Sequence, residues 1–256
     1  MSDATRPLSG QTILVTGGSG GIGAAIVEQL ASEGARALIH YSRDEQGAQR
    51  LLDRIGGKGW IVQGDLSKET GPEDLWEAAL ELAGGRIHGL INNAGIRTEI
   101  PLEAPSSEWR AAWRREFQVN FFAAADLSRE AVIHFRANGG GRIINMASRA
   151  AQRGYAADAL PYGTSKAALI NLTKSLARSV AGEGIVAVAI APGWVRTDMA
   201  EQFVAQHGEA AAVSDIPVGR MANPSEIAEL VAFTLRPSQA SLNGATLDVN
   251  GGSYIR

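Results

Sequence analysis

Short runs of apolar, largely β-branched residues alternate with longer segments along the 256-residue chain, and this alternation limits the fold more than any other feature. In the longer segments apolar residues recur at the helix period, as at Leu169, Leu172 and Leu176. Alternating strands and helices build βαβ units, which form a parallel sheet with helices on both faces. We expect strands at residues 12–16, 37–41, 60–63, 87–91, 142–146, 185–191 and 245–249, and helices at residues 23–33, 45–55, 73–82, 108–135, 165–180 and 225–235.

These elements predict one α/β domain over residues 1–256, a Rossmann-type, doubly wound sheet of about seven parallel strands with helices on both faces. No internal repeat, low-complexity tract or Pro/Ser/Gly linker divides the chain. Asn223, Pro224 and Glu226 have the order of a capped helix start, and residues 138–141 (Asn-Gly-Gly-Gly) suit a helix end before a strand.

Charge and composition exclude several function classes. The chain has 24 Lys and Arg against 27 Asp and Glu and no basic run, so we expect no nucleic-acid partner and no anionic membrane surface as partner. It has no cysteine, which excludes disulfides, cysteine-ligated zinc and thiol nucleophiles. Its four histidines lack metal-binding spacing, and we expect no metal site; they are His40, His88, His134 and His207.

The N-terminal residues 1–7 are polar, and the longest apolar run, residues 185–191, is far shorter than the ~20 residues of a membrane span. We therefore expect a soluble, cytoplasmic protein.

A glycine-rich segment follows the first expected strand and leads into a helix. Such a strand, turn and helix can bring backbone N–H groups and a helix N-terminus to a pyrophosphate. A plain tight turn is the alternative, and the position on the first βαβ unit favours the phosphate site. The candidate cofactor residues here are Gly17, Ser19, Gly20, Gly21, Ile22 and Gly23.

The second expected strand ends at Tyr41, Ser42 and Arg43, where a site that prefers NAD would usually present a carboxylate to the ribose. A hydroxyl and a guanidinium suit a 2′-phosphate instead, so NADP(H) is favoured over NAD(H). The alternative is that Arg43 only begins a solvated helix. Further candidates stand where the third and fourth strands end, where ligands bind in such sheets: Asp65, Leu66, Asn92, Ala94 and Gly95.

Tyr162 and Lys166 are four residues apart and would project from one face of a helix. A nearby cation stabilises a phenolate, so this pair suits proton exchange with an alcohol or carbonyl oxygen. Ser148 ends a strand at the same sheet edge and could orient the substrate oxygen, or it could be only a turn former. Asn120 is polar within an apolar helical segment and needs a partner if buried; it could also simply bond a backbone carbonyl.

Together these motifs resemble the short-chain dehydrogenase/reductase family over nearly the whole chain: Thr16-Gly-x-x-x-Gly21-x-Gly23, Asn92-Asn93-Ala94-Gly95, Ser148, Tyr162-x-x-x-Lys166 and Pro192-Gly193. The resemblance implies a catalytic set of Asn120, Ser148, Tyr162 and Lys166, with Asn120 supporting a bound water and Lys166 also holding the nicotinamide ribose. It implies a homotetramer that packs through residues 108–135, residues 165–180 and the C-terminal strand. It also implies cofactor contacts from Tyr162 and Lys166, and contacts with the nicotinamide end from Pro192, Gly193, Val195 and Thr197.

Two positions depart from the family pattern. Many NADP-preferring members carry a basic residue where this chain has Gly20, so only one of two usual phosphate contacts remains. The interval from Ser148 to Tyr162 is about one residue longer than usual, within residues 155–159, which bears on substrate shape.

We therefore expect an NAD(P)-dependent enzyme that interconverts a carbonyl and a secondary alcohol. An NAD-dependent sugar or polyol dehydrogenase and a non-catalytic dinucleotide-binding regulator are the alternatives. The lack of a basic run argues against an acyl-carrier-protein substrate, although the chain resembles 3-oxoacyl-carrier-protein reductases.

The expected substrate is small, polar and anionic, because Arg97, Arg149 and Trp194 should face the nicotinamide pocket. The alternative is that both arginines turn outward and pair with acids such as Glu99 or Asp158. Residues 153–160 and a mobile lid at residues 199–216 should complete the pocket.

Overall fold

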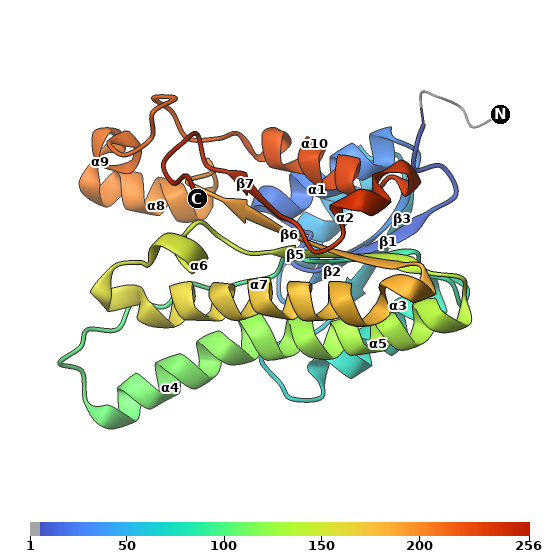
Figure 1. Cartoon of the computed structure of the whole chain (residues 1–256), viewed down its shortest axis with the longest axis horizontal. Helices are drawn as coiled ribbons and strands as arrows, with labels where there is room; N and C mark the ends of the chain where they lie inside the picture. The colour runs from blue at the N-terminus through green and yellow to red at the C-terminus, as the bar shows by residue number, and fades with distance from the viewer. Residues whose placement is uncertain (1–5) are drawn as a thin grey trace.

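Seven strands form one sheet in the computed structural model, which describes residues 6–256 (Figure 1). The single α/β domain and its strand count confirm the predicted fold class. The expectation for the polar N-terminus falls in part on residues 1–5, which lie outside the described residues. The strands are β1 (Thr12–Val15), β2 (Arg36–Tyr41), β3 (Gly59–Gln63), β4 (Gly89–Asn92), β5 (Gly141–Met146), β6 (Ile185–Pro192) and β7 (Thr246–Val249).

The sheet order is β3-β2-β1-β4-β5-β6-β7, and every neighbouring pair is parallel. The chain therefore builds outward from β1 in one direction and, after crossing to β4, outward in the other. Ligands bind at such a reversal, beyond the carboxyl ends of the strands. The junction of β1 and β4 is where a site is expected.

Two helical layers cover the sheet (Figure 1). Their apolar faces bury separate cores, one around Ile26 and Val231 and the other around Leu127 and Phe135. Burial on both faces explains why the strands are almost wholly apolar. One layer holds α1 (Gly21–Ser32), α2 (Glu45–Arg54) and α10 (Pro224–Leu235), and the other holds α3 (Gly71–Leu82), α4 (Ser106–Phe117), α5 (Ala123–Ala137) and α7 (Leu160–Val180).

The expected helix over residues 108–135 is not one α-helix. It consists of α4 and α5 joined by a π-helical turn at Gln118–Phe122. The side chain of Asn120, inside this turn, bonds both the N–H and the carbonyl of Ile96, at 2.8 and 2.9 Å. Local π-turns of this kind often accompany functional residues.

The expected lid segment is also helical. Two helices, α8 (Asp198–His207) and α9 (Glu209–Val213), occupy most of residues 199–216, and a short α6 (Ala150–Arg153) follows β5. Three further 3₁₀ turns lie at Ala157–Ala159, Ala181–Glu183 and Pro237–Leu242.

The local boundary predictions are confirmed. Asn223 and Glu226 form a reciprocal capping box at the start of α10. Gly140 has a φ of +101° between α5 and β5, a conformation that favours glycine.

Candidate active site

A groove follows the carboxyl edge of the sheet and consists of two connected hollows of about 380 and about 920 Å³. Gly17, Ala94 and Gly95 line both hollows, so the loops after β1 and β4 form the junction between them. A long ligand can therefore lie across the junction, with one end in each hollow.

The loop between β1 and α1 has the shape that a pyrophosphate requires. Gly17 and Gly21 have φ of +61° and +53°, which other residues rarely adopt. A Cβ on Gly23 would lie 2.1 Å from the carbonyl oxygen of Gly17, so only glycine lets helix and loop approach. Helix α1 has no side-chain cap and no acid in its first turn, which leaves its N-terminal N–H groups for an anion. The chain's own residues thus fit a dinucleotide.

Two side chains not predicted from the sequence brace this loop. Asn93 donates through Nδ2 to the carbonyl oxygens of Thr16 and Gly17, at 2.9 and 3.1 Å. His40 accepts a 2.9 Å hydrogen bond at Nδ1 from the N–H of Gly17, and its Nε2 lies 3.2 Å from the carbonyl of Gly64. Burial lowers the pKa of His40 to about 4, so its ring is neutral. The Asn-Asn-Ala-Gly motif in the sequence could have pointed to Asn93, whereas no motif in the sequence points to His40.

The larger hollow contains the side chains expected around the adenine ribose. Ser42 and Arg43 lie at its edge beside Asp44, which also lines it. Asp44 Oδ1 accepts a 2.9 Å hydrogen bond from the N–H of Gly47 and caps α2. The other expected residues of this hollow are also in its lining, namely Ser19, Tyr41, Asp65 and Leu66.

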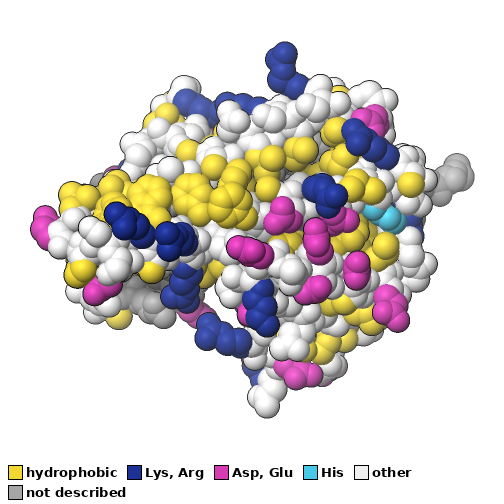
Figure 2. All heavy atoms as spheres, turned by 90° about the horizontal axis from the view of Figure 1, so that it is seen from below, with side chains coloured by type: hydrophobic (Ala, Val, Ile, Leu, Met, Phe, Trp, Pro, Cys, Tyr) yellow, Lys and Arg dark blue, Asp and Glu magenta, His cyan; other side chains and the backbone are white. Residues whose placement is uncertain are grey.

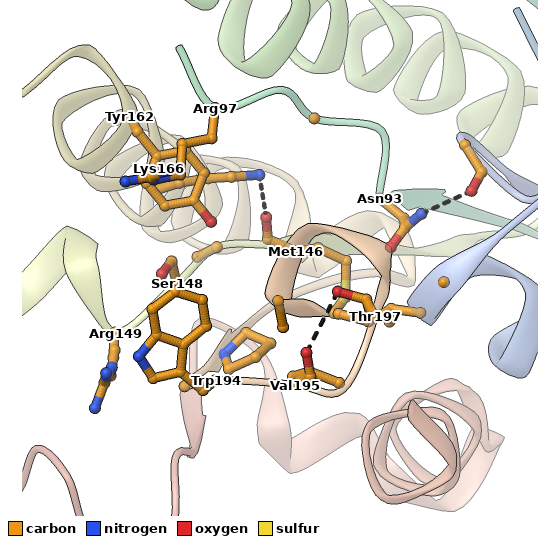
Figure 3. Close-up of a pocket in the computed structure, with 18 of the residues that line it drawn as sticks. Asn93, Arg97, Met146, Ser148, Arg149, Tyr162, Lys166, Trp194, Val195 and Thr197 are labelled. Carbon is orange, nitrogen blue, oxygen red and sulfur yellow. Dashed lines mark hydrogen bonds between the residues drawn. The ribbon is translucent and has the colours of Figure 1, made fainter. Parts of the chain in front are cut away.

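The smaller hollow brings together Ser148, Tyr162 and Lys166 (Figure 3). Tyr162 and Lys166 lie one turn apart on α7, as their spacing predicts, and Lys166 Nζ stands 6.0 Å from the centre of the Tyr162 ring. Lys166 Nζ donates a 2.8 Å hydrogen bond to the carbonyl of Met146, at the end of β5. Ser148 follows that strand, so β5 and α7 together hold the cluster.

Burial shifts the pKa values of both Tyr162 and Lys166. It raises the pKa of Tyr162 to about 12, and interaction with the hydroxyl of Ser148 acts in the opposite direction. Burial lowers the pKa of Lys166 to about 8, against the opposing charge of Glu116. At neutral pH the phenol therefore holds its proton and the amine remains largely charged.

Asn120 stands behind the groove and does not line it. Its side chain is buried and hydrogen-bonded to Ile96, to Glu116 and to Ser165, which answers the expectation that it needs partners. A Cβ on Gly95 would lie 3.3 Å from Asn120 Oδ1 and 3.2 Å from Lys166 Nζ. Asn120 and Lys166 are thus near neighbours on the same side of Gly95.

The three candidate substrate residues all line the smaller hollow, but they differ in what they can bind. Arg97 lies beside the Tyr155 ring, its guanidinium 5.5 Å from the ring centre, and pairs with Glu99 at 2.6 Å. Trp194 packs against Phe203 with ring centres 4.7 Å apart.

Arg149 is buried, and its NH1 bonds both oxygens of Asp215 at 3.2 and 3.1 Å. Its side chain points away from Tyr162 (Figure 3). Arg149 thus lines the hollow as expected, but its guanidinium is engaged by an acid, as in the alternative reading, and that acid is Asp215 instead of Asp158.

Two candidate cofactor residues lie behind the groove. Asn92 is buried and donates to Ser128 and Asn145, at 3.1 and 2.8 Å, so it ties β4 to α5 and β5. Gly23 packs on Gly17 as described above. Neither residue lines the groove, so the structure gives both a structural role, and their direct contact with a cofactor stays a prediction. The remaining candidates are in the lining: Gly20, Ile22, Pro192, Gly193, Val195 and Thr197.

Of the described side chains in the segments expected to complete the pocket, Tyr155 from residues 153–160 and Ala200 from the lid segment line the smaller hollow. The side chains of Met199 and Gln202 lie outside the described residues.

Within residues 6–256 no helix is both long and apolar enough to cross a membrane. The same residues contain no group of three or more His, Cys, Asp or Glu that could hold a metal ion.

Comparison with known proteins agrees with this geometry. The family model adh_short_C2, described as enoyl-(acyl carrier protein) reductase, matches residues 17–254. The chain is 37% identical over 252 residues to the 3-oxoacyl-[acyl-carrier-protein] reductase FabG of Vibrio cholerae, covering 97% of this chain and 99% of that protein.

Solved structures give the same picture. A proposed NAD(P)-dependent gluconate 5-dehydrogenase from Beutenbergia cavernae, with bound NADP at low occupancy, superposes with a TM-score of 0.88 at 34% identity, covering 98% of this chain and 99% of that one. The 3-ketoacyl-(acyl-carrier-protein) reductase from Brucella melitensis in complex with NADH superposes with a TM-score of 0.87 at 32% identity, covering 97% of this chain and 100% of that one. The protein thus belongs to the short-chain dehydrogenases/reductases and is an NAD(P)-dependent oxidoreductase that acts on CH–OH groups.

Proposed function

We propose that this protein is an NADP(H)-preferring reductase that interconverts a small ketone and its secondary alcohol, with Tyr162 as the acid and base. The observation that carries the proposal is the cluster of Ser148, Tyr162 and Lys166 in the smaller hollow of the groove. A hydroxyl, a phenol and a buried cation in one hollow are suited to holding and protonating a carbonyl oxygen.

The protein's part in the reaction is to orient the substrate oxygen and to move one proton. The bound nicotinamide supplies or accepts the hydride. Ser148 donates a hydrogen bond to the substrate oxygen, and Tyr162 gives it a proton during reduction or takes one during oxidation. The charge of Lys166 stabilises the phenolate that remains after reduction.

The pKa of Tyr162 favours the reductive direction. At about 12 it keeps the phenol protonated at neutral pH, which is the form that a proton donor needs. Oxidation would first require the phenol to lose that proton, which a nearby cation such as Lys166 makes easier.

The preference for NADP(H) rests on the end of β2. Ser42 and Arg43 lie at the larger hollow, while the carboxylate of Asp44 is engaged as the cap of α2. A guanidinium and a hydroxyl suit a phosphate, whereas a free carboxylate would repel one.

The proposed substrate is a small, polar, anionic compound such as a keto acid or its hydroxy acid. Arg97 lies in the same hollow as Tyr162, and its NH1 pairs with Glu99 at 2.6 Å. A guanidinium has five N–H donors, so one that pairs with a single carboxylate keeps donors for the carboxylate of a ligand. The similar Beutenbergia structure is proposed to act on gluconate, which is a polyhydroxy acid. We therefore propose a sugar acid as substrate in preference to a long acyl chain on a carrier protein.

The protein also presents a surface suited to a homotetramer. Aromatic rings continue along α4 into the π-turn, with ring centres 5.8 Å apart for Trp113 and Phe117 and 6.2 Å for Phe117 and Phe121. Phe122 is 49% exposed and Ile133, on α5, is 50% exposed. Apolar side chains form a band on the face that carries these helices (Figure 2). Burying such a band against a second copy would remove it from water.

A panel assay tests the proposed function. The oxidation of NADPH and of NADH is followed by absorbance against keto acids, sugar ketones and a short 3-oxoacyl thioester. We expect turnover with NADPH, fastest for a keto acid. Cofactor binding without turnover of any compound would favour the non-catalytic regulator, and faster turnover with NADH would favour the sugar dehydrogenase.

A further inference from the structure

Glu116 is a fully buried carboxylate that the reaction described above does not use. It lies on α4 one helical turn before Asn120, so the two side chains share a face. Its Oε2 accepts a 2.9 Å hydrogen bond from the N–H of Thr98, and its Oε1 accepts a 3.1 Å hydrogen bond from Asn120 Nδ2. A buried carboxylate is costly, so its place in the catalytic neighbourhood calls for a role.

The partners of Glu116 suit its ionised form. Both carboxylate oxygens face donors, and an ionised carboxylate accepts at both, whereas a protonated one must place a hydrogen at one of them. The pKa of Glu116 is raised above its ordinary value, chiefly by burial, while the bonds from Thr98 and Asn120 and the charge of Lys166 act in the opposite direction. The other ionisable groups around this cluster are Tyr162 on α7, Arg97 after β4 and Tyr155 after α6.

The bond from Glu116 also fixes which way the amide of Asn120 points. Asn120 Oδ1 accepts from the N–H of Ile96 at 2.8 Å, while Nδ2 donates to Glu116. A flipped amide would set its NH₂ against the N–H of Ile96 and its oxygen against the carboxylate. In the observed orientation Oδ1 lies on the side of Gly95 where Lys166 Nζ is found.

We propose that Glu116 is a positioning residue of the reductase site: its carboxylate orients the amide of Asn120, and its negative charge offsets the positive charge of Lys166 inside the protein. The inference rests on the proposed function, because it assigns Lys166 to that site. The charge of Glu116 raises the pKa of Lys166 and the pKa of Tyr162. For Lys166 this opposes burial, which lowers its pKa. Removing the charge should therefore lower both values.

The test is the pH dependence of NADPH binding, followed by fluorescence from about pH 6 to about pH 10. In the wild type, affinity falls at alkaline pH as Lys166 loses its proton, and Lys166→Met removes this transition, which assigns it. In Glu116→Gln the transition should occur on the order of one pH unit lower. Glu116→Asp keeps the charge and should keep the wild-type transition. Glu108→Gln removes an exposed acid from the same helix and is the matched control.

A second readout uses the reaction itself. The alkaline fall in kcat for reduction should move to lower pH in Glu116→Gln by the same amount, because reduction needs protonated Tyr162 and charged Lys166. A purely structural role would lower kcat or Tm without moving either transition.

An unchanged transition in a Glu116→Gln protein that binds NADPH overturns the inference, whatever happens to the rate. If that variant does not fold, Glu116→Met removes the charge with a side chain of similar length, and the same shift is expected. Wild-type protein that binds NADPH but turns over no carbonyl would contradict the proposed function, and the binding transition would still decide the role of Glu116.

Discussion

Asp44 Oδ1 accepts a 2.9 Å hydrogen bond from the N–H of Gly47, so the acid that follows β2 serves as the N-cap of α2. Ser42 and Arg43 line the same hollow and are the side chains that we propose to meet the ribose 2′ position. The proposed NADP(H) preference rests on this contact, because a site that prefers NAD usually presents a free carboxylate to the ribose hydroxyls.

Replacing Arg43 with Ala should therefore weaken the binding of NADPH more than the binding of NADH. A charge-assisted phosphate contact corresponds to about tenfold or more in affinity, and NADH makes no such contact. Dissociation constants for both dinucleotides on both proteins test this. Equal losses for the two, or a wild-type preference for NADH, would show that Arg43 is only a solvated residue at the start of α2.

Gly20 offers the converse experiment. A Cβ at this position meets nothing within 4 Å, and its backbone is extended, so a larger residue is permitted. Gly20→Arg should restore the second cation that many NADP-preferring relatives carry and should tighten NADPH binding severalfold. Gly20→Gln, of similar bulk and without charge, is the control. An equal gain in both variants would assign the effect to contact area instead of charge.

Arg97 should set the preference for an anionic substrate. We expect Arg97→Ala to lower kcat/KM for a keto acid by about tenfold or more, as for loss of a charged hydrogen bond, and to spare its uncharged ester. Arg149→Ala breaks the pair with Asp215 and should lower Tm without changing the ratio of acid to ester. The idea of an anionic substrate fails if wild type prefers the ester and Arg97→Ala leaves that preference unchanged.

His40 should make the fold sensitive to acid. Its folded pKa of about 4 lies below the usual value of 6.5, so the unfolded chain takes up a proton first as the pH falls. The contribution of His40 to the free energy of unfolding is fully present above pH 6.5 and is lost as the pH falls from 6.5 to 4. About 2 kcal/mol of it is lost between pH 7 and pH 5.

Denaturant unfolding of wild type and His40→Gln at these two pH values measures that contribution. The variant should be less stable at pH 7 and should lose less stability on going to pH 5. An identical pH dependence in the two proteins would mean that another group causes the acid sensitivity.

The apolar band along α4, the π-turn and α5, which includes Phe117, Phe122 and Ile133, should form the interfaces of a homotetramer. Sedimentation equilibrium is expected to give four times the chain mass of 26.9 kDa. Phe122→Glu places a charge on the exposed part of this band and should yield smaller species, whereas Leu82→Glu, on α3, should not. A wild-type monomer at micromolar concentration would contradict the proposal.

Much of the fold and of the catalytic cluster could be predicted because the relevant signals are local. The apolar strand runs are continuous, since both faces of the sheet are covered. Tyr162 and Lys166 are one helical turn apart in the sequence, and that spacing alone places them together. The glycine loop is likewise contiguous in the chain.

What could not be predicted depends on contacts between distant segments. Arg149 pairs with Asp215, which is 66 residues further along the chain. The π-turn contains Asn120, whose side chain bonds Ile96, 24 residues earlier in the sequence. Asn92 and Asn93 are adjacent, and successive side chains at a strand end point to opposite sides, so one is buried and the other lines the groove. Nothing in the local sequence says which is which.

The most direct test of the account is Tyr162→Phe, measured for NADPH binding and for turnover of the best carbonyl substrate. The phenol is assigned the proton transfer and no essential part in binding the dinucleotide. The variant should bind NADPH with nearly wild-type affinity and should lose turnover by about 10²-fold or more, as is typical when an acid or base is removed. Turnover close to the wild-type rate would contradict the assignment of Tyr162 as the acid and base.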